Sequence, residues 1–87
     1  MQTVFLPTSC RAIECIASYI HNQSSFVDLG CGDGAVVEAV ARANGAMQCY
    51  GVELNESLCN RARIRCKDLP NVELFQLEIS NFSLQVD

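Results

Sequence analysis

Apolar positions along the chain follow two spacings, one typical of buried strands and one typical of amphipathic helices. Apolar runs at residues 26–29 and 46–52, with a further candidate at 72–78, predict three strands. Apolar residues spaced three and four apart predict helices over 7–20, 35–43 and about 56–67. Strands and helices that alternate in this way predict an α/β fold with a parallel sheet.

The two later helices are each predicted to have one buried and one exposed face. Glu38 and Arg42 lie four residues apart on an outer face, where they can form an ion pair. Positive side chains dominate the outer face of the last helix, near its C-terminus, where cations are favoured. We interpret them as a solvated face rather than an RNA contact, because their spacing wraps around the helix. The inward positions are Val36, Val37, Val40, Ala41, Leu58, Cys59, Ala62 and Cys66, and the outward cations are Arg61, Arg63, Arg65 and Lys67.

The stretch of residues 26–34, with the sequence FVDLGCGDG, carries the most chemical information. An apolar strand ends in an acid, glycines then stand at every second position, and a helix follows. Glycine tolerates φ > 0 and has no Cβ, so a glycine loop lets the backbone turn tightly beneath a ligand. A strand, a glycine loop and a helix N-terminus together form a cradle for a nucleotide cofactor.

Three interpretations of this loop compete. A dinucleotide fingerprint fits Gly30, Gly32 and Ala35, and it would indicate the NAD(P)-binding part of an oxidoreductase. Against it, Asp28 and Asp33 would place negative charge near a pyrophosphate. Those acids suit the cationic ammonium and sulfonium groups of S-adenosylmethionine, which carries no phosphate, so this cofactor is favoured. The third interpretation is an ordinary turn in which the acids only form turns and cap the helix.

A second acid stands where the next strand ends. One strand–helix–strand repeat, the length of a βαβ unit, separates Asp28 from Glu53. In a parallel sheet Glu53 therefore lies at the same edge as the glycine loop, where its carboxylate can accept hydrogen bonds from both hydroxyls of a ribose. The alternative is a solvated acid ahead of a helix that Asn55 caps. An acid at this strand end together with the glycine loop is more specific than either feature alone.

Taken together, these segments resemble the class I S-adenosylmethionine-dependent methyltransferases. The residues that carry the resemblance are 27–34 (VDLGCGDG), 50–55 (YGVELN) and 72–78 (VELFQLE). Glu78 is a departure, since the family usually has Asp beside the adenine amine. The opening residues 5–8 (FLPT), ahead of a helix, are similar to one branch of the family. That branch contains small protein-lysine methyltransferases that act on the ATP synthase c-subunit and the adenine nucleotide translocase.

The resemblance implies a Rossmann-like fold whose first three strands stand in the order 3-2-1, with flanking helices. It implies an enzyme that moves the sulfonium methyl of S-adenosylmethionine, by in-line displacement, to a nucleophile that we expect to be a protein lysine. The glycines would let the backbone approach the methionine part, Asp28 and Asp33 would favour its cationic groups, and Glu53 would hold the ribose. Glu78 and Ile79 would border the adenine, and no catalytic residue is identified. The implied cofactor-binding residues are Asp28, Gly30, Cys31, Gly32, Asp33, Gly34, Glu53, Leu54, Glu78 and Ile79.

Length limits this interpretation. The 87 residues allow one small domain at most, whereas a class I methyltransferase sheet has seven strands. We therefore expect residues 1–87 to be the amino-terminal, cofactor-binding half of a larger domain whose C-terminal half is missing, and to be inactive alone. In the 3-2-1 order the strand at 26–29 would be an open apolar edge. A further hypothesis is a truncated, non-catalytic module that binds cofactor or a partner through that edge.

The net charge and the cysteine pattern indicate which partners and which cellular compartment to expect. Ten acidic and six basic residues give a net charge of −4, which does not support a nucleic-acid partner. The six cysteines include no C-x-x-C pair, so no metal site is predicted, and we expect them to be small buried residues in a reducing intracellular compartment. Only Cys31 lies near a helix N-terminus that could lower its pKa. Neither a membrane span nor a secretory signal is predicted. The compartment is cytoplasmic or mitochondrial, and the mitochondrial address rests on the branch resemblance alone.

Overall fold

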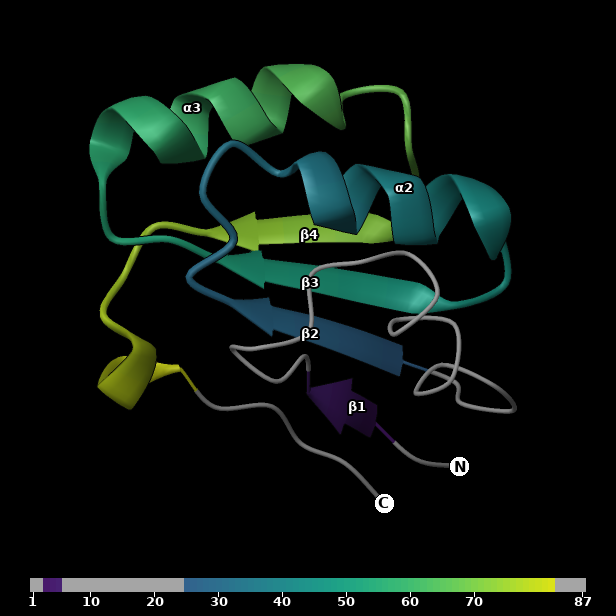
Figure 1. The fold of residues 1–87 in the computed structure, drawn as a ribbon, viewed down its shortest axis with the longest axis horizontal. Helices are drawn as coiled ribbons and strands as arrows, with labels where there is room; N and C mark the ends of the chain where they lie inside the picture. The colour runs from purple at the N-terminus through teal and green to yellow at the C-terminus, as the bar shows by residue number, and fades with distance from the viewer. Residues whose placement is uncertain (1–2, 6–24, 83–87) are drawn as a thin grey trace.

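The computed structural model describes residues 3–5 and 25–82, and Figure 1 shows their arrangement. Strands and helices alternate along this part of the chain. The elements are β1 (Thr3–Phe5), β2 (Ser25–Leu29), α2 (Ala35–Ala43), β3 (Gln48–Val52), α3 (Glu56–Arg65), β4 (Val72–Phe75) and the short 3-10 turn η1 (Ile79–Asn81). The helix predicted over residues 7–20 lies outside the described residues, as do Cys10 and Cys15.

The strands form one parallel sheet in the order β1-β2-β3-β4. Its register is set by pairs such as Ser25 with Gln48 and Cys49 with Val72. The three predicted strands, now β2, β3 and β4, are therefore neighbours in the expected 3-2-1 order, and the Rossmann-like α/β prediction is confirmed. α2 connects β2 to β3, and α3 connects β3 to β4, and in each case the next strand runs parallel to the one before it. Both cover the same face of the sheet, as Figure 1 shows and as right-handed crossovers require.

One prediction about the sheet is wrong. The sequence pattern leaves the strand at residues 26–29 as an open edge, but β1 pairs with β2 in parallel, with Thr3 opposite Ser25 and Phe5 opposite Val27. β2 is therefore an interior strand flanked by β1 and β3, and the sheet has a fourth strand that was not predicted. The residues of β1 are β-branched or aromatic, which suits a strand, but three residues are too few for an alternation to be recognised.

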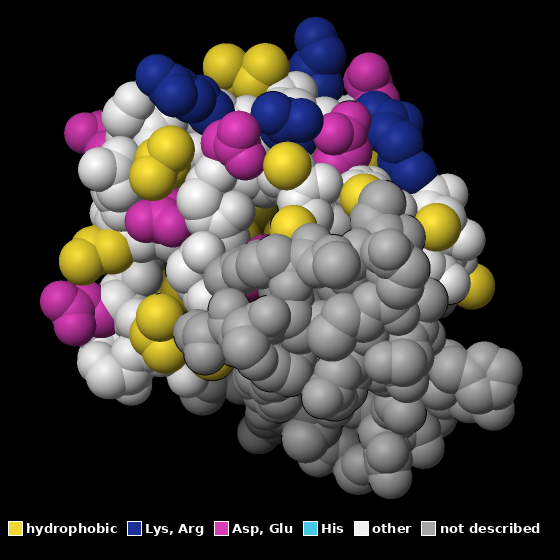
Figure 2. Space-filling model, in the orientation of Figure 1, with side chains coloured by type: hydrophobic (Ala, Val, Ile, Leu, Met, Phe, Trp, Pro, Cys, Tyr) yellow, Lys and Arg dark blue, Asp and Glu magenta, His cyan; other side chains and the backbone are white. Residues whose placement is uncertain are grey.

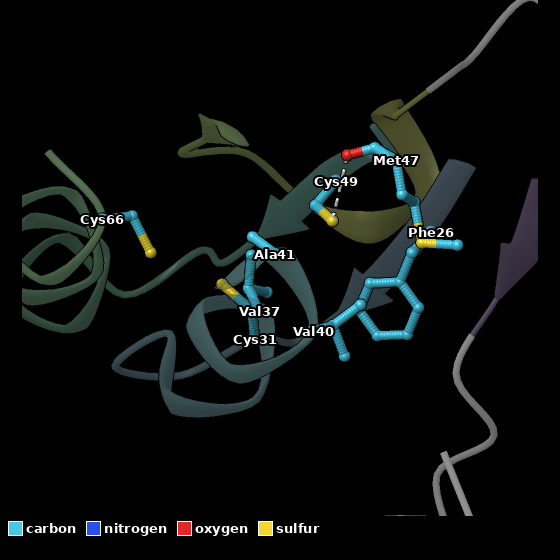
Figure 3. Packing of buried hydrophobic residues seen from close by; sticks show 8 residues of the cluster. All are labelled: Phe26, Cys31, Val37, Val40, Ala41, Met47, Cys49 and Cys66. Atoms are coloured by element: carbon cyan, nitrogen blue, oxygen red, sulfur yellow. Dashed lines mark hydrogen bonds between the residues drawn. The ribbon is translucent and has the colours of Figure 1, made fainter. Parts of the chain in front are cut away.

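The hydrophobic core lies between the helices and one face of the sheet (Figure 3). In Figure 3 the Phe26 ring from β2 lies beside Val40 of α2 and near Met47 of the following turn. Leu69, Val72 and Leu74 pack against this cluster from the β4 side. Most of the inward helix positions are confirmed, and Val36 and Leu58 are half-buried instead of buried. The confirmed positions are Val37, Val40, Ala41, Cys59, Ala62 and Cys66.

Four cysteines contribute to this core as free thiols, namely Cys31, Cys49, Cys59 and Cys66. Burial raises the pKa of the Cys49 thiol to about 12, so that thiol is protonated at neutral pH and packs as a small apolar group. Its Sγ donates weakly to the carbonyl of Met47 at 3.7 Å, the dashed line in Figure 3. The expectation of small buried cysteines is confirmed for these four residues.

The two helices begin in different ways. The Oδ1 atom of Asn55 accepts a hydrogen bond from the N–H of Leu58 at 2.9 Å, so Asn55 is the N-cap of α3. α2 instead begins at Gly34, which has a left-handed backbone and no side chain to act as a cap. The predicted ion pair forms on the outer face of α2, with 2.9 Å between Arg42 Nη2 and Glu38 Oε2. In the part of the chain that the structure describes, neither helix has the length and apolar character to cross a bilayer.

The side-chain amide of Asn71 ties the end of α2 to the start of β4. Its Nδ2 donates toward three backbone carbonyls, those of Ala41 and Asn44 at 3.2 Å and of Met47 at 2.9 Å. The carbonyl of Asn71 also accepts the N–H of Cys49 at 2.7 Å. Because carbonyls at a helix end have no donor within the helix, Asn71 satisfies them and fixes the turn that leads into β3.

Candidate functional site

The glycine loop connects the end of β2 to the start of α2. Gly30, Gly32 and Gly34 have φ values of 79°, 58° and 83°, which other L-residues rarely adopt. The N–H groups of Gly30 and Cys31 both donate to the carbonyl of Val52, at 2.7 and 2.9 Å. The backbone geometry therefore explains the three glycines, and it holds the loop against the end of β3.

Two close approaches fix the position of the loop relative to the helices and the sheet. A Cβ on Gly34 would lie 2.8 Å from the Cβ of Ala62 in α3. A Cβ on Gly51 in β3 would lie 2.9 Å from the Sγ of Cys31 and 2.6 Å from the Cδ2 of Leu74. The absence of side chains at these two positions lets α2 approach α3 and lets the loop settle onto the sheet.

Glu53 lies at the end of β3, beside the glycine loop, as the βαβ spacing predicts. Its Oε1 accepts the N–H of Gly32 at 2.8 Å, and its Oε2 accepts the N–H of Asn55 at 3.0 Å. The two bonds hold the carboxylate between the glycine loop and Asn55, the N-cap of α3. A carboxylate has about four lone-pair sites, so both oxygens keep the capacity to accept a further hydrogen bond from a ligand.

A groove of about 490 Å³ lies along the carboxyl ends of β2 and β3. Five of the predicted cofactor-binding residues line it, namely Gly30, Glu53, Leu54, Glu78 and Ile79. Leu54 is 57% exposed and Ile79 is 51% exposed, so two large apolar side chains face solvent at the groove. Val52 and Ser80 also line it and were not predicted. Val52 could have been found from its place just before Glu53, whereas no pattern marks Ser80.

The other predicted residues do not line the groove. Asp28 is completely buried in β2, opposite Gly51 of β3. Cys31 belongs to the hydrophobic core, and its side chain lies against Gly51 of β3 and does not line the groove. Burial, followed by the negative charges of Asp28 and Glu53, raises the pKa of the Cys31 thiol to about 12. The idea that the α2 N-terminus lowers this pKa is therefore wrong, because desolvation and two nearby carboxylates outweigh it.

Asp33 turns toward the helices, away from the groove. Its Oδ1 accepts the N–H of Ala35 at 3.2 Å, and its Oδ2 pairs with Nη2 of Arg65 at 3.2 Å. Arg65 Nε also donates to the backbone carbonyl of Asp33 at 3.1 Å, and Arg65 Nη1 pairs with Glu38 Oε1 at 3.2 Å. In this geometry Asp33 accepts the N–H of the first residue of α2 and pairs with an arginine, which matches the turn-forming alternative for this residue.

Arg65 is the residue that sequence reasoning assigned least well. It is exposed on the outer face of α3 as predicted, but it also reaches from α3 to the glycine loop and to α2, which was not predicted. No short-range signal could have found this contact, because Asp33 and Arg65 are 32 positions apart in the sequence. Figure 2 shows Lys and Arg side chains interleaved with Asp and Glu side chains over the helical side of the molecule. The acids divide the positive charge there, so that no continuous basic patch forms on this face.

Residues 3–5 and 25–82 contain no group of three or more His, Cys, Asp or Glu side chains that could bind a metal ion. The three carboxylates at or near the glycine loop instead have different surroundings. Asp28 lies in the sheet, Asp33 pairs with Arg65, and Glu53 holds the backbone beside the groove.

Comparison with protein families identifies a matching domain. A family model described as a methyltransferase domain matches residues 26–87, which is more than half of the chain. No curated protein matches the chain. The matched segment begins in β2 and includes the glycine loop, Glu53 and every residue that lines the groove.

Proposed function

The chain belongs to the methyltransferase-domain family, and from that membership we propose that it binds S-adenosylmethionine in the groove beside the glycine loop. Members of this family use S-adenosylmethionine as the methyl donor. The observation that carries the proposal is the carboxylate of Glu53, which lines the groove and is oriented by two backbone N–H groups. A carboxylate held in this way can accept hydrogen bonds from two adjacent hydroxyl groups, which is the recognition chemistry that a ribose requires.

The apolar side chains at the groove support a site for the adenine. Leu54 follows Glu53 directly, and Ile79 lines the same groove from η1. Each leaves about half of its surface open to solvent, at 57% and 51%, and covering that surface with an aromatic base is favourable. Glu78 lies beside Ile79 at the groove and supplies an acceptor for an exocyclic amine.

Charge supports S-adenosylmethionine over a dinucleotide. Asp28 is completely buried at the end of β2, one residue before Leu29 and the loop. The negative charge of Asp28 is felt at the glycine loop, because, after burial, it contributes to the raised pKa of the Cys31 thiol. Charge of this sign favours a cationic ligand and disfavours a pyrophosphate. The ammonium and sulfonium groups of S-adenosylmethionine are both cationic, whereas a dinucleotide would bring two negative phosphates to the loop.

We propose protein lysine as the methyl acceptor, following the resemblance of residues 5–8 to the protein-lysine branch. In that reaction the neutral lysine amine attacks the methyl carbon, the carbon–sulfur bond breaks as the carbon–nitrogen bond forms, and S-adenosylhomocysteine leaves. The methylated amine then loses its extra proton. Catalysis of this kind comes mainly from holding donor and acceptor in line, and we assign no residue of this chain to proton removal. The four free buried cysteines fit a reducing compartment, which we propose to be cytoplasmic or mitochondrial.

The test is isothermal titration of the chain with S-adenosylhomocysteine, with NAD as the comparison ligand. We expect binding of the first and not of the second. Glu53→Gln removes one acceptor oxygen and the negative charge, and it should weaken binding by about tenfold or more, the scale of a lost charge-assisted hydrogen bond. Glu73→Gln is the matched control, because Glu73 is an exposed acid on β4 that does not line the groove.

Either of two results would overturn the proposal. One is a wild-type chain that is folded by circular dichroism yet binds no S-adenosylhomocysteine. The other is tighter binding of NAD than of S-adenosylhomocysteine, which would favour the dinucleotide interpretation of the glycine loop.

A further inference from the structure

Arg65 joins the glycine loop to both helices, and this gives it a role beyond charge on the surface. We propose that Arg65 is a positioning residue that holds the second half of the glycine loop in the form that binds the cofactor. The inference rests on the proposed function, because it assumes that the groove beside the loop binds S-adenosylmethionine. It assigns no contact between Arg65 and the ligand.

The two halves of the loop are held in different ways. The first half is tied to β3, since the N–H groups of Gly30 and Cys31 donate to the carbonyl of Val52. The second half carries Asp33, whose own contacts are local apart from Arg65. Arg65 grips both the carboxylate and the backbone carbonyl of Asp33, at 3.2 and 3.1 Å. Two donors from one planar guanidinium fix the orientation of a residue as well as its position.

The contact is placed where it can affect ligand binding. Asp33 follows Gly32, and the N–H of Gly32 donates to Glu53 at 2.8 Å. A shift of Asp33 therefore moves the Gly32 N–H relative to the carboxylate that we propose as the ribose ligand. Glycines flank Asp33 on both sides, at φ values of 58° and 83°, and glycine backbones have the widest range of alternative conformations. Arg65 restricts that range through its two contacts with Asp33.

A purely structural role is the competing explanation. Arg65 Nη1 also pairs with Glu38 Oε1 at 3.2 Å, which connects α3 to α2. If this connection were the whole role of Arg65, loss of Glu38 and loss of Arg65 would have the same effects. The loop contacts predict a difference, because Glu38→Gln removes the negative charge that pairs with Arg65 and Arg42 and leaves both bonds from Arg65 to Asp33 in place.

The experiment compares four variants of the full chain by titration with S-adenosylhomocysteine and by urea unfolding. Arg65→Met keeps the length of the side chain without its charge, and we expect affinity to fall about three- to tenfold, the range of coupling in such networks. Arg65→Lys keeps the charge but not the fork, and we expect it to recover only part of that loss. Glu38→Gln should lower stability while affinity stays within about twofold of wild type. Arg63→Met is the matched control on the same helix, since Arg63 hydrogen-bonds only Asn60 among the described residues.

Ionic strength gives a second readout when Glu38→Gln is measured beside Arg65→Met, because salt screens the Arg65–Glu38 pair as well as the Arg65–Asp33 pair. A surface groove of about 360 Å³, lined by Asp33, Arg61, Ile64 and Arg65, opens onto the Arg65–Asp33 pair, so salt ions reach it. We expect the affinities of the wild type and of Glu38→Gln to fall more steeply with salt than that of Arg65→Met, because only these two keep the Arg65–Asp33 pair to screen.

The outcomes separate the inference from the proposed function. If the wild type does not bind S-adenosylhomocysteine, the proposed function fails and the inference fails with it. If the wild type binds and Arg65→Met binds equally well, the proposed function stands and the inference alone is overturned. Equal losses of affinity in Arg65→Met and Glu38→Gln would also overturn it, since they would show that Arg65 acts only by joining the helices.

Discussion

Gly34 and Ala62 lie so close together that a methyl group at position 34 would meet the Ala62 Cβ at 2.8 Å. The N-cap residue of α2 thus lies against the middle of α3, and the contact sets the spacing between the two helices. The contact of Arg65 with the glycine loop depends on that spacing, because Arg65 and Ala62 belong to the same helix.

Gly34→Ala should therefore lower the free energy of unfolding through two separable effects. A left-handed backbone, φ 83°, costs an alanine about 1–2 kcal/mol, and the overlap with Ala62 adds about 1–3 kcal/mol. Urea unfolding followed by circular dichroism measures the sum. Ala62→Gly removes the 2.8 Å contact and leaves the Cα of residue 62 at 3.1 Å from the added methyl group, so Gly34→Ala should cost less in that background. Equal costs in the two backgrounds would show that the close contact does not matter for stability.

Asn71 is predicted to contribute more to stability than its position on a surface turn indicates. Asn71→Ala removes the donor shared by three carbonyls and should lower the free energy of unfolding by about 1–3 kcal/mol. Asn71→Asp keeps the shape but points a negative oxygen at those carbonyls, so its effect should be at least as large. Asn60→Ala is the control, because Asn60 is exposed and makes only a 3.4 Å contact with Arg63. A loss from Asn71→Ala no larger than that from Asn60→Ala would contradict the prediction.

The buried thiols predict a fall of stability in alkaline solution. Burial raises the pKa of both Cys31 and Cys49 from 9.0 to about 12. Between these values the unfolded chain loses the thiol proton and the folded chain keeps it, so stability is complete below pH 9 and is lost as pH rises toward 12. The slope is about 1.4 kcal/mol per pH unit for each thiol.

Urea unfolding in a reducing buffer, repeated at several pH values, measures this slope. Cys31→Ala should reduce it by the contribution of one thiol, whatever the variant does to stability at neutral pH. A slope for Cys31→Ala equal to that of the wild type would show that Cys31 ionises as readily in the folded chain as in the unfolded one.

The elements that repeat a clear pattern were predictable, and those that depend on distant residues were not. α2 spans the predicted residues 35–43, because four apolar positions at helical spacing specify it. β1 was missed, since its three residues are too short to show a pattern. β4 ends at Phe75, earlier than the predicted 78, because the chain then turns toward η1 and the groove.

The candidate site divides in the same way. Glu53 was placed correctly because the length of a βαβ unit brings successive strand ends to one edge. The side chains of Cys31 and Asp33 could not be placed, since a glycine loop has no periodicity to indicate their direction. Cys31 points into the core and Asp33 points to α3. The packing of the loop onto Gly51 of β3 determines the direction of Cys31, and Arg65 of α3 determines that of Asp33. Both contacts join residues far apart in sequence.

The register of the sheet also bears on how fast the chain can fold. Thr3 pairs with Ser25, Ser25 with Gln48, and Cys49 with Val72, so each ladder joins residues 22 or 23 positions apart. The described sheet contains no hairpin, and every strand pair must close a loop of nearly equal length before its first hydrogen bond forms. Closing such loops costs entropy that local contacts cannot offset in advance. Folding should therefore be slow for a chain of this size, with the ladders forming together rather than spreading from one local nucleus.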